Sequence, residues 1–204
     1  MSNNKILYTN QVSGETGKRV VDYFNSKGGC IEKSIMSDEE YDMLVAAKLQ
    51  SSFNKEKALE VLGIDESQVR EIPPVCFHGY TYNERILDKH NIQILSGECK
   101  DGEMRSSAYK ITWIFFGDDE IYFFQEIFCL DCAVSWTMTD EFFYNDIVNF
   151  FTTKVTIYGK NIESTFSIMV PGETKDVSLV MSERNMAAIE GMKQKLREKK
   201  RQMR

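Results

Sequence analysis

The spacing of hydrophobic positions changes at Pro73-Pro74. Before this pair, hydrophobic residues recur every three or four positions, which is typical of amphipathic helices. After it, they alternate with polar residues or form continuous runs, which is typical of β-strands. Proline breaks a helix and disfavours helical backbone in the residue before it. The pattern therefore predicts a helical N-terminal region over residues 1–72 and a β-domain over residues 73–204.

Three short helices are predicted in the N-terminal region. The first ends at Gly28-Gly29. The second begins at Ser37, because a serine followed three positions later by Glu40 is the pattern of a capping box. The third runs from Asn54, a good N-cap residue, to Gly63, a typical residue just after a helix end. Helices this short need a partner surface, and the β-domain is the candidate for it.

Residues 109–158 hold 15 of the chain's 24 aromatic side chains, which fit the pleated, half-buried surface of a sheet. Gly117-Asp118-Asp119 joins two of the apolar runs as a predicted antiparallel hairpin. A last amphipathic helix is predicted to begin at Ser182 and to carry Met186, Ile189, Met192 and Leu196 near one face. The predicted strands cover residues 75–82, 91–96, 107–116, 120–130, 133–144, 153–158, 163–170 and 175–181.

Consecutive aromatics in this β-rich region indicate that more than one face of the sheet is covered. Neighbouring residues of a strand point to opposite faces, so Phe142-Phe143 and Phe150-Phe151 cannot all face one core. We expect the N-terminal helices to cover the second face, with a homo-oligomer interface or another protein as the alternatives. The candidate partner-binding aromatics are Trp136, Phe143 and Phe151.

The order of these segments resembles the pleckstrin-homology-like architecture of bacterial proteins. The residues that carry the resemblance lie in the runs 111–124 and 141–148 and in the ending from Phe166 to Leu196. It covers about residues 75–200 and rests on pattern. It implies an α+β fold in which antiparallel strands form a curved, partly open barrel of two sheets, with the C-terminal helix plugging one end.

In proteins of similar fold, a basic loop between early strands can hold a phosphorylated headgroup. The resemblance makes Lys100, Arg105 and Lys110 the candidate ligand-binding residues, although neighbouring acids offset most of their charge. A second basic segment closes the chain, where residues 193–204 carry seven Lys or Arg against one acid. Lys199, Lys200 and Arg201 are therefore candidates for contact with a protein partner or with anionic lipid.

Charge and composition narrow the compartment and the partners. The chain has a net charge of −6, and because residues 193–204 contribute +6, the part before residue 193 has a net charge of −12. This acidic charge argues against broad binding to nucleic acid. The sequence has no apolar run of transmembrane length and no secretory signal at its start. Five cysteines at irregular spacing do not form a disulfide framework. We therefore expect a cytoplasmic protein with reduced thiols and no transmembrane segment.

Chemistry-bearing motifs are sparse. Cys129 and Cys132 could chelate zinc or form a redox pair, and Cys76 with His78 is the only other local source of ligands for a four-coordinate site. The sequence shows no phosphate-binding glycine loop and no recognisable nucleophile with its base. We therefore predict no catalytic residues and no cofactor.

The sequence leads to three functional hypotheses. The first is a non-catalytic module that recognises a protein or peptide through a sheet edge or an aromatic face. The second is peripheral binding to anionic lipid through the basic loop and tail. The third is a zinc or redox protein centred on its cysteines.

Overall fold

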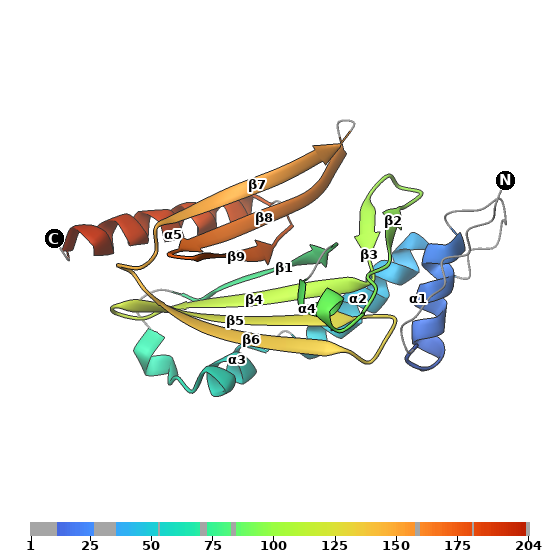
Figure 1. Ribbon diagram of the computed structural model, residues 1–204, viewed down its shortest axis with the longest axis horizontal. Helices are drawn as coiled ribbons and strands as arrows, with labels where there is room; N and C mark the ends of the chain where they lie inside the picture. The colour runs from blue at the N-terminus through green and yellow to red at the C-terminus, as the bar shows by residue number, and fades with distance from the viewer. Residues whose placement is uncertain are drawn as a thin grey trace.

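The protein has an α+β fold with helices at its N-terminus, antiparallel sheets in its middle and a long C-terminal helix (Figure 1). The computed structural model describes residues 12–26, 36–52, 54–69, 73–82, 85–157, 160–180 and 182–202. The helices are α1 (Gly14–Ser26), α2 (Asp38–Ser52), α3 (Lys55–Leu62), the 3-10 turn η1 (Glu66–Val69), α4 (Arg85–Lys89) and α5 (Glu183–Gln202).

The helix ends follow the capping signals in the sequence. The Ser37 amide donates to Glu40 Oε2 at 2.7 Å and the Glu40 amide donates to Ser37 Oγ at 3.1 Å, so the predicted capping box is confirmed. Asn54 Oδ1 accepts from the amide of Lys57 at 3.0 Å. Gly63 has a φ of 69°, the left-handed conformation that ends a helix and that glycine adopts most readily.

The central sheet contains four antiparallel strands, in the order β1 (Val75–Thr81), β4 (Ala108–Phe116), β5 (Glu120–Cys129) and β6 (Ser135–Phe143). β4 and β5 form the predicted hairpin, in which Phe116 lies opposite Ile121. The Gly117 amide closes its turn by donating to the carbonyl oxygen of Glu120 at 2.9 Å. Every residue of β4 is buried, including the polar Lys110 and Thr112, and burial on both faces accounts for the largely hydrophobic sequence of this strand.

A second antiparallel sheet follows in the chain, formed by β7 (Asn149–Ile157), β8 (Lys160–Val170) and β9 (Glu173–Ser178) in that order. In the sequence, a small hairpin of β2 (Ser96–Glu98) and β3 (Met104–Ser106) lies between β1 and β4. The predicted strand over residues 91–96 is wrong, since only Ser96 lies in a strand. Ile92 and Ile94 alternate because they pack beside Ile127 of β5, without joining a strand ladder.

The central sheet is covered on both faces by segments from opposite ends of the chain (Figure 1). On one face, Tyr23 of α1, Tyr41 of α2 and Leu59 of α3 pack in one core with aromatic residues of β4 and β5. On the other face, residues of β8, β9 and α5 form a second core with residues of all four strands. The expectation that the N-terminal helices cover a face of the sheet is confirmed.

The two sheets approach most closely where β1 meets the end of β9. A Cβ added to Gly79 would lie 3.1 Å from the backbone nitrogen of Leu179, and the amide of Val180 donates to the His78 carbonyl oxygen at 3.2 Å. No strand of one of these sheets pairs with a strand of the other, so together with the β2–β3 hairpin the described strands form three separate sheets and no closed barrel.

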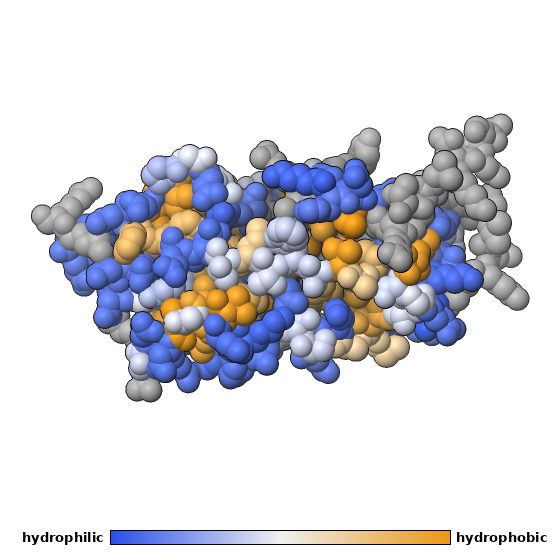
Figure 2. Space-filling model, turned by 60° about the horizontal axis from the view of Figure 1, so that its bottom comes forward, coloured by the Kyte–Doolittle hydropathy of each residue, from blue (hydrophilic) through white to orange (hydrophobic). Residues whose placement is uncertain are grey.

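Large exposed hydrophobic side chains are scattered along the chain. Figure 2 shows one face of the molecule, where hydrophobic residues reach the surface in patches divided by hydrophilic ones. Phe143 and Val148, each 55% exposed, flank the connection between the two sheets. None of the described helices is long and apolar enough to cross a membrane.

Candidate functional site

The best-formed candidate site is a groove between the start of β7 and the C-terminal half of α5, called here the β7–α5 groove. α5 begins after Ser182, whose Oγ accepts from the Asn185 amide at 3.1 Å, and it buries Ile189, Met192 and Leu196 against the second core, as predicted. This places its C-terminal half beside β7. The groove has a volume of about 280 Å³ and is lined by Val148, Asn149, Phe150, Lys193, Leu196, Arg197 and Lys200.

Three cations line one wall of this groove. Lys193, Arg197 and Lys200 are spaced by four and three residues, so they share one face of the helix. Lys193 Nζ lies 3.0 Å from Glu190 Oε1, while Lys200 Nζ donates to the Val148 carbonyl oxygen at 3.5 Å. The other lining residues are exposed Val148, just before β7, Asn149 and Phe150 at the start of this strand, and Leu196 of α5. The groove thus combines positive charge with a β-strand edge.

Most of the predicted partner-binding residues lie near this groove. Phe151 is half-buried on β7, and Lys200 lines the groove itself. The ammonium of Lys199 lies 5.7 Å from the centre of the Tyr144 ring, next to exposed Phe143. Arg201 is exposed on the last turn of α5. Trp136 lies elsewhere, half-buried on β6 with its ring centre 5.4 Å from that of His90.

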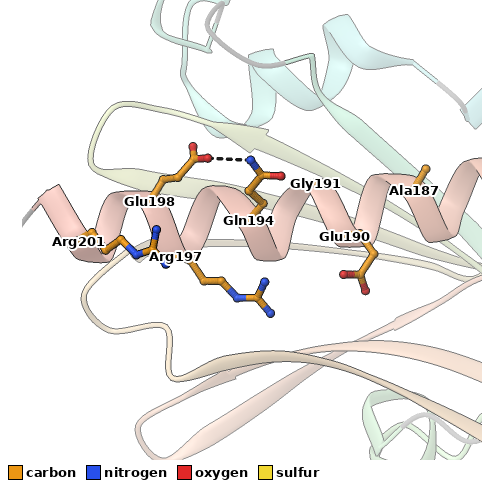
Figure 3. Close-up of a pocket in the computed structure, with 7 residues that line it drawn as sticks. All are labelled: Ala187, Glu190, Gly191, Gln194, Arg197, Glu198 and Arg201. Carbon is orange, nitrogen blue, oxygen red and sulfur yellow. Dashed lines mark hydrogen bonds between the residues drawn. The ribbon is translucent and has the colours of Figure 1, made fainter.

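The outer face of α5 holds a second depression, of about 640 Å³ (Figure 3). All of its lining residues belong to this one helix, and Gln194 Nε2 donates to Glu198 Oε1 at 2.9 Å. Arg197 and Arg201 are balanced there by Glu190 and Glu198. Because all of its lining residues lie on one helix, this depression is open helix surface. It has no second wall that could match the shape of a ligand.

The three basic residues predicted for a phosphorylated headgroup do not converge. Arg105, on β3, is buried and bonded to two carboxylates: its Nε and Nη2 donate to Asp42 at 2.8 and 2.7 Å, and its Nη1 and Nη2 donate to Asp101 at 2.9 and 2.7 Å. These hydrogen bonds raise the pKa of Arg105. Lys100 is exposed in the β2–β3 turn. Arg105 therefore fastens the hairpin to α2.

Lys110 lies between the two sheets and away from that hairpin turn. Its side chain is buried on β4, and its Nζ donates to the backbone oxygen of Asp176 on β9 at 3.4 Å. Gln125 Nε2 donates to the same oxygen at 3.1 Å and to Thr112 Oγ1 at 3.0 Å. This polar group links the sheets in the interior, where hydrogen bonds offset the cost of burying it.

The turn from β5 to β6 brings Cys129 and Cys132 together with Asp131. Their sulfur and carboxylate oxygen atoms lie within 4.8 Å of one another. A hydrogen bond with Cys132 lowers the pKa of Cys129, and the same interaction raises the pKa of Cys132. Burial raises the pKa of Asp131 to about 6. The group has the donor atoms of a metal site or a dithiol.

Cys76 and His78 lie away from this cluster. Both are on β1, which is separated from β5 by β4, and Cys76 pairs with Trp113 whereas Cys129 pairs with Ala108. His78 Nδ1 is hydrogen-bonded to the Tyr109 hydroxyl at 2.8 Å, and burial lowers the pKa of His78. The four ligands suggested by the sequence therefore do not meet at one point.

Two features of these sites were not singled out from the sequence. Asp131 lies between the two cysteines in the sequence. Because carboxylates are common zinc ligands, its residue type could have indicated a third ligand. The spacing of Lys193, Arg197 and Lys200 was a readable signal for one basic helix face. That this face meets the start of β7 depends on contacts between distant segments, which local patterns do not encode.

Comparisons with known proteins add no identification. No family model matches the chain, and searches of curated proteins and solved structures return no match.

Proposed function

We propose that this protein is a non-catalytic binding module with a pleckstrin-homology-like domain, and that it binds an extended acidic peptide by adding it to the free edge of β7. The observation that carries the proposal is the β7–α5 groove, in which the start of β7, an outer strand of its sheet, and three cations of α5 line one groove. Strand addition supplies affinity through main-chain hydrogen bonds and specificity through the neighbouring side chains.

The connectivity supports the fold part of this proposal. Four meandering strands, interrupted by the β2–β3 hairpin and α4, are followed by three meandering strands and a terminal helix. Antiparallel sheets followed by a terminal helix are the coarse part of what the sequence resemblance implies, which is a curved, partly open barrel of two sheets with the helix plugging one end. Fold alone is weak support for function, so the evidence for peptide binding is the β7–α5 groove.

The edge of β7 is suitable for pairing. Among the described strands, β7 pairs only with β8, and it is nine residues long. Lys154 and Val155 are exposed on it, and the register shifts between Val155 and Thr156. Such irregularities limit uncontrolled edge-to-edge pairing. A peptide would therefore pair over the regular part of β7, nearest to α5.

The charges of the groove select the chemistry of the peptide. Lys193, Arg197 and Lys200 line the groove that a paired peptide would enter, and Lys193 is also paired with Glu190 at 3.0 Å. Acidic side chains on alternate peptide residues would all point toward one face. An anionic strand with apolar residues at its other positions fits both the cations and exposed Val148.

The β6 edge is the competing site. Among the described strands it pairs only with β5, and a groove of about 330 Å³ beside it is lined by Val61, Leu62, Thr139, Asp140 and Glu141. Its charge is acidic, and Asp140 is already paired with Lys175 at 3.0 Å. A peptide bound there would need to be basic. The two edges therefore make opposite predictions about peptide charge.

The separation of the basic segments favours a peptide over a membrane surface. Binding to anionic lipid through the loop and tail together needs both on one side. Figure 1 shows the β2–β3 hairpin and the C-terminal end of α5 at opposite ends of the molecule. We therefore assign the basic residues of α5 to peptide binding together with β7.

The test is a titration with a labelled peptide of alternating Glu and Val, long enough to pair along β7, compared with its Lys-Val counterpart. We expect saturable binding of the acidic peptide, weakened by salt, with backbone amide shifts concentrated in residues 149–155. Methylating alternate peptide nitrogens should abolish binding in one register, because it removes main-chain donors.

The double variant Arg197→Glu with Lys200→Glu should weaken binding at least about tenfold, since reversing charge places like charges together. Lys18→Glu, an exposed charge reversal on α1, is the matched control and should bind as the wild type does. Shifts at β6 with the basic peptide, or acidic-peptide binding that the double variant leaves intact, would contradict the proposal.

A further inference from the structure

The turn between β5 and β6 holds two thiols and one carboxylate in the protein interior. Cys129 ends β5, Asp131 and Cys132 lie in the turn, and the three side chains are 6%, 0% and 4% exposed. We propose that this cluster binds one Zn²⁺ ion through Cys129, Asp131 and Cys132, with the fourth coordination position open to a water molecule or a small ligand. The inference does not depend on the proposed peptide site.

The ligand atoms are arranged closely enough for a single ion. All three lie within 4.8 Å of one another. Two thiolates bound to a tetrahedral zinc at about 2.3 Å stand about 3.8 Å apart. The cluster would therefore contract by at most about 1 Å on binding, a displacement that side-chain rotation can supply. Each thiol would release its proton to solvent as its sulfur binds the metal.

Backbone contacts within the turn and from residues 12–13 hold the turn in place. The Cys129 amide donates to the Val134 carbonyl oxygen at 3.0 Å, which closes the turn on itself. The Ser13 amide donates to the Asp131 carbonyl oxygen at 2.9 Å, and Val12 forms an isolated β-bridge with Cys132. The site is therefore pre-organised by backbone, which lowers the cost of assembling the ligands.

The chemistry of the ligands favours zinc over harder cations. Calcium and magnesium take oxygen ligands, whereas two thiolates with one carboxylate suit zinc. Two thiolates and a carboxylate carry a charge of −3, which a divalent ion reduces to −1. Because the cluster is buried, this reduction in charge contributes strongly to the binding free energy, since charged groups in the interior need a partner or a metal.

A cavity beside Cys132 gives the fourth position its access. It has a volume of about 400 Å³, and Cys132 is part of its wall. Among the described residues, the cluster includes no fourth side chain of metal-binding type. Three protein ligands with an open position are typical of zinc sites that bind an exchangeable ligand, and structural sites usually have four. The cavity is lined by Val12, Ser13, Ile92, Cys132, Ala133 and Val134.

A second group of similar composition provides a contrast. Asp38, Cys99 and Asp101 also lie within 4.8 Å of one another. In this group, Asp38 Oδ1 accepts from the Tyr23 hydroxyl at 2.8 Å, and the charge of Asp101 is already balanced by Arg105, which donates to it. The Cys99 sulfur lies 3.2 Å from the same tyrosine oxygen. This group stabilises the α1–α2 contact and is the internal control for the proposed site.

The test is a titration of the reduced full-length protein with Co²⁺, which reports tetrahedral thiolate coordination by its visible absorption, followed by displacement with Zn²⁺. We expect one ion per chain and loss of the Co²⁺ spectrum when zinc is added. Cys132→Ser should weaken binding at least about tenfold, since even supporting residues of zinc sites change affinity by about 10- to 100-fold. Cys99→Ser should bind Co²⁺ as the wild type does.

A second measurement needs no variant and covers the case in which Cys132→Ser does not fold. Zinc should slow alkylation of Cys129 and Cys132, mapped by peptide mass, while leaving Cys76 and Cys99 unchanged. No metal-dependent protection and no thiolate spectrum would overturn the proposal. Air oxidation to a Cys129–Cys132 disulfide without metal uptake, with O₂ as the oxidant and a mass loss of two hydrogens, would also overturn it.

Discussion

At the scale of single residues, two helical glycines have opposite surroundings. A Cβ added to Gly17 in α1 would lie 2.3 Å from the backbone oxygen of Asp131, whereas one added to Gly191 in α5 would meet nothing within 4 Å. Gly17 therefore sets how closely α1 approaches the β5–β6 turn. Gly191 lies on the outer face of its helix, where glycine only lowers helix propensity.

We predict that Gly17→Ala destabilises the protein although alanine favours helix. Its methyl group would push against backbone, and overpacking of this kind costs about 1–3 kcal/mol. Gly191→Ala should instead stabilise by up to about 1 kcal/mol, because only the helix propensity changes. Urea unfolding of both variants measures the two effects. Equal stabilisation by both substitutions would contradict the close approach of α1 to the turn.

Residue-scale features divide into those that the sequence could predict and those that it could not. The caps at Ser37, Asn54 and Ser182 follow from local chemistry within one turn of helix, and the structure confirms each of them. The partners of Arg105 could not be predicted from the sequence, because Asp42 lies 63 positions away in the chain. Sequence patterns thus reveal local hydrogen bonds, but not which acid meets which base.

At the scale of elements, the strongest hydrophobic runs gave boundaries that are accurate to one residue. β4 was predicted over residues 107–116 and spans Ala108–Phe116, and β5 was predicted over 120–130 and spans Glu120–Cys129. The prediction failed over residues 91–96, where alternating isoleucines pack on the sheet without pairing. Alternation reports which side of a segment is buried, and burial does not require a strand ladder.

The β2–β3 hairpin offers a prediction at this scale. Its attachment to α2 depends on the buried guanidinium of Arg105, which bonds Asp42 and Asp101. Arg105→Met should reduce the free energy of unfolding by about 1.5–3 kcal/mol, the usual contribution of hydrogen bonds to a charged group. Amide hydrogen exchange in residues 96–106 should accelerate more than exchange in β4.

The control for that variant is Lys100→Met, in the same hairpin. Lys100 is exposed, and its interaction with α2 is through its backbone amide, which donates to Asp38 Oδ2 at 2.9 Å. Replacing its side chain should therefore leave both stability and exchange near those of the wild type. An equal effect of the two substitutions would show that general charge, not the Arg105 contacts, holds the hairpin.

At the scale of the whole molecule, the N-terminal helices cover an aromatic face of the central sheet. That face includes Trp113, Phe115, Phe124 and Phe128, which share a core with Tyr23 and Tyr41. Deleting residues 1–69 should therefore give a chain that aggregates, because a large contiguous apolar surface becomes exposed. Size-exclusion chromatography of the truncated protein measures this directly.

Supplying residues 1–69 as a separate chain during expression should restore a soluble complex, since the contacts are noncovalent. A truncated protein that stays monomeric and melts cooperatively would contradict the packing described for α1–α3. The sequence predicted that the second face is covered, from consecutive aromatics that cannot share one core. It could not specify how the second sheet lies over the other face, because contacts such as that of Gly79 with Leu179 involve distant segments.

The two covers of the central sheet come from opposite ends of the chain, and this has a consequence during synthesis. Translation completes α1–α3 before β4 and β5, so the cover for one face already exists when those aromatic strands leave the ribosome. The other face waits for β7–β9 and α5, the last segments to be made. A nascent chain stalled shortly after β6 would thus display Phe123 and Phe142 uncovered. That interval is when this protein most needs a chaperone.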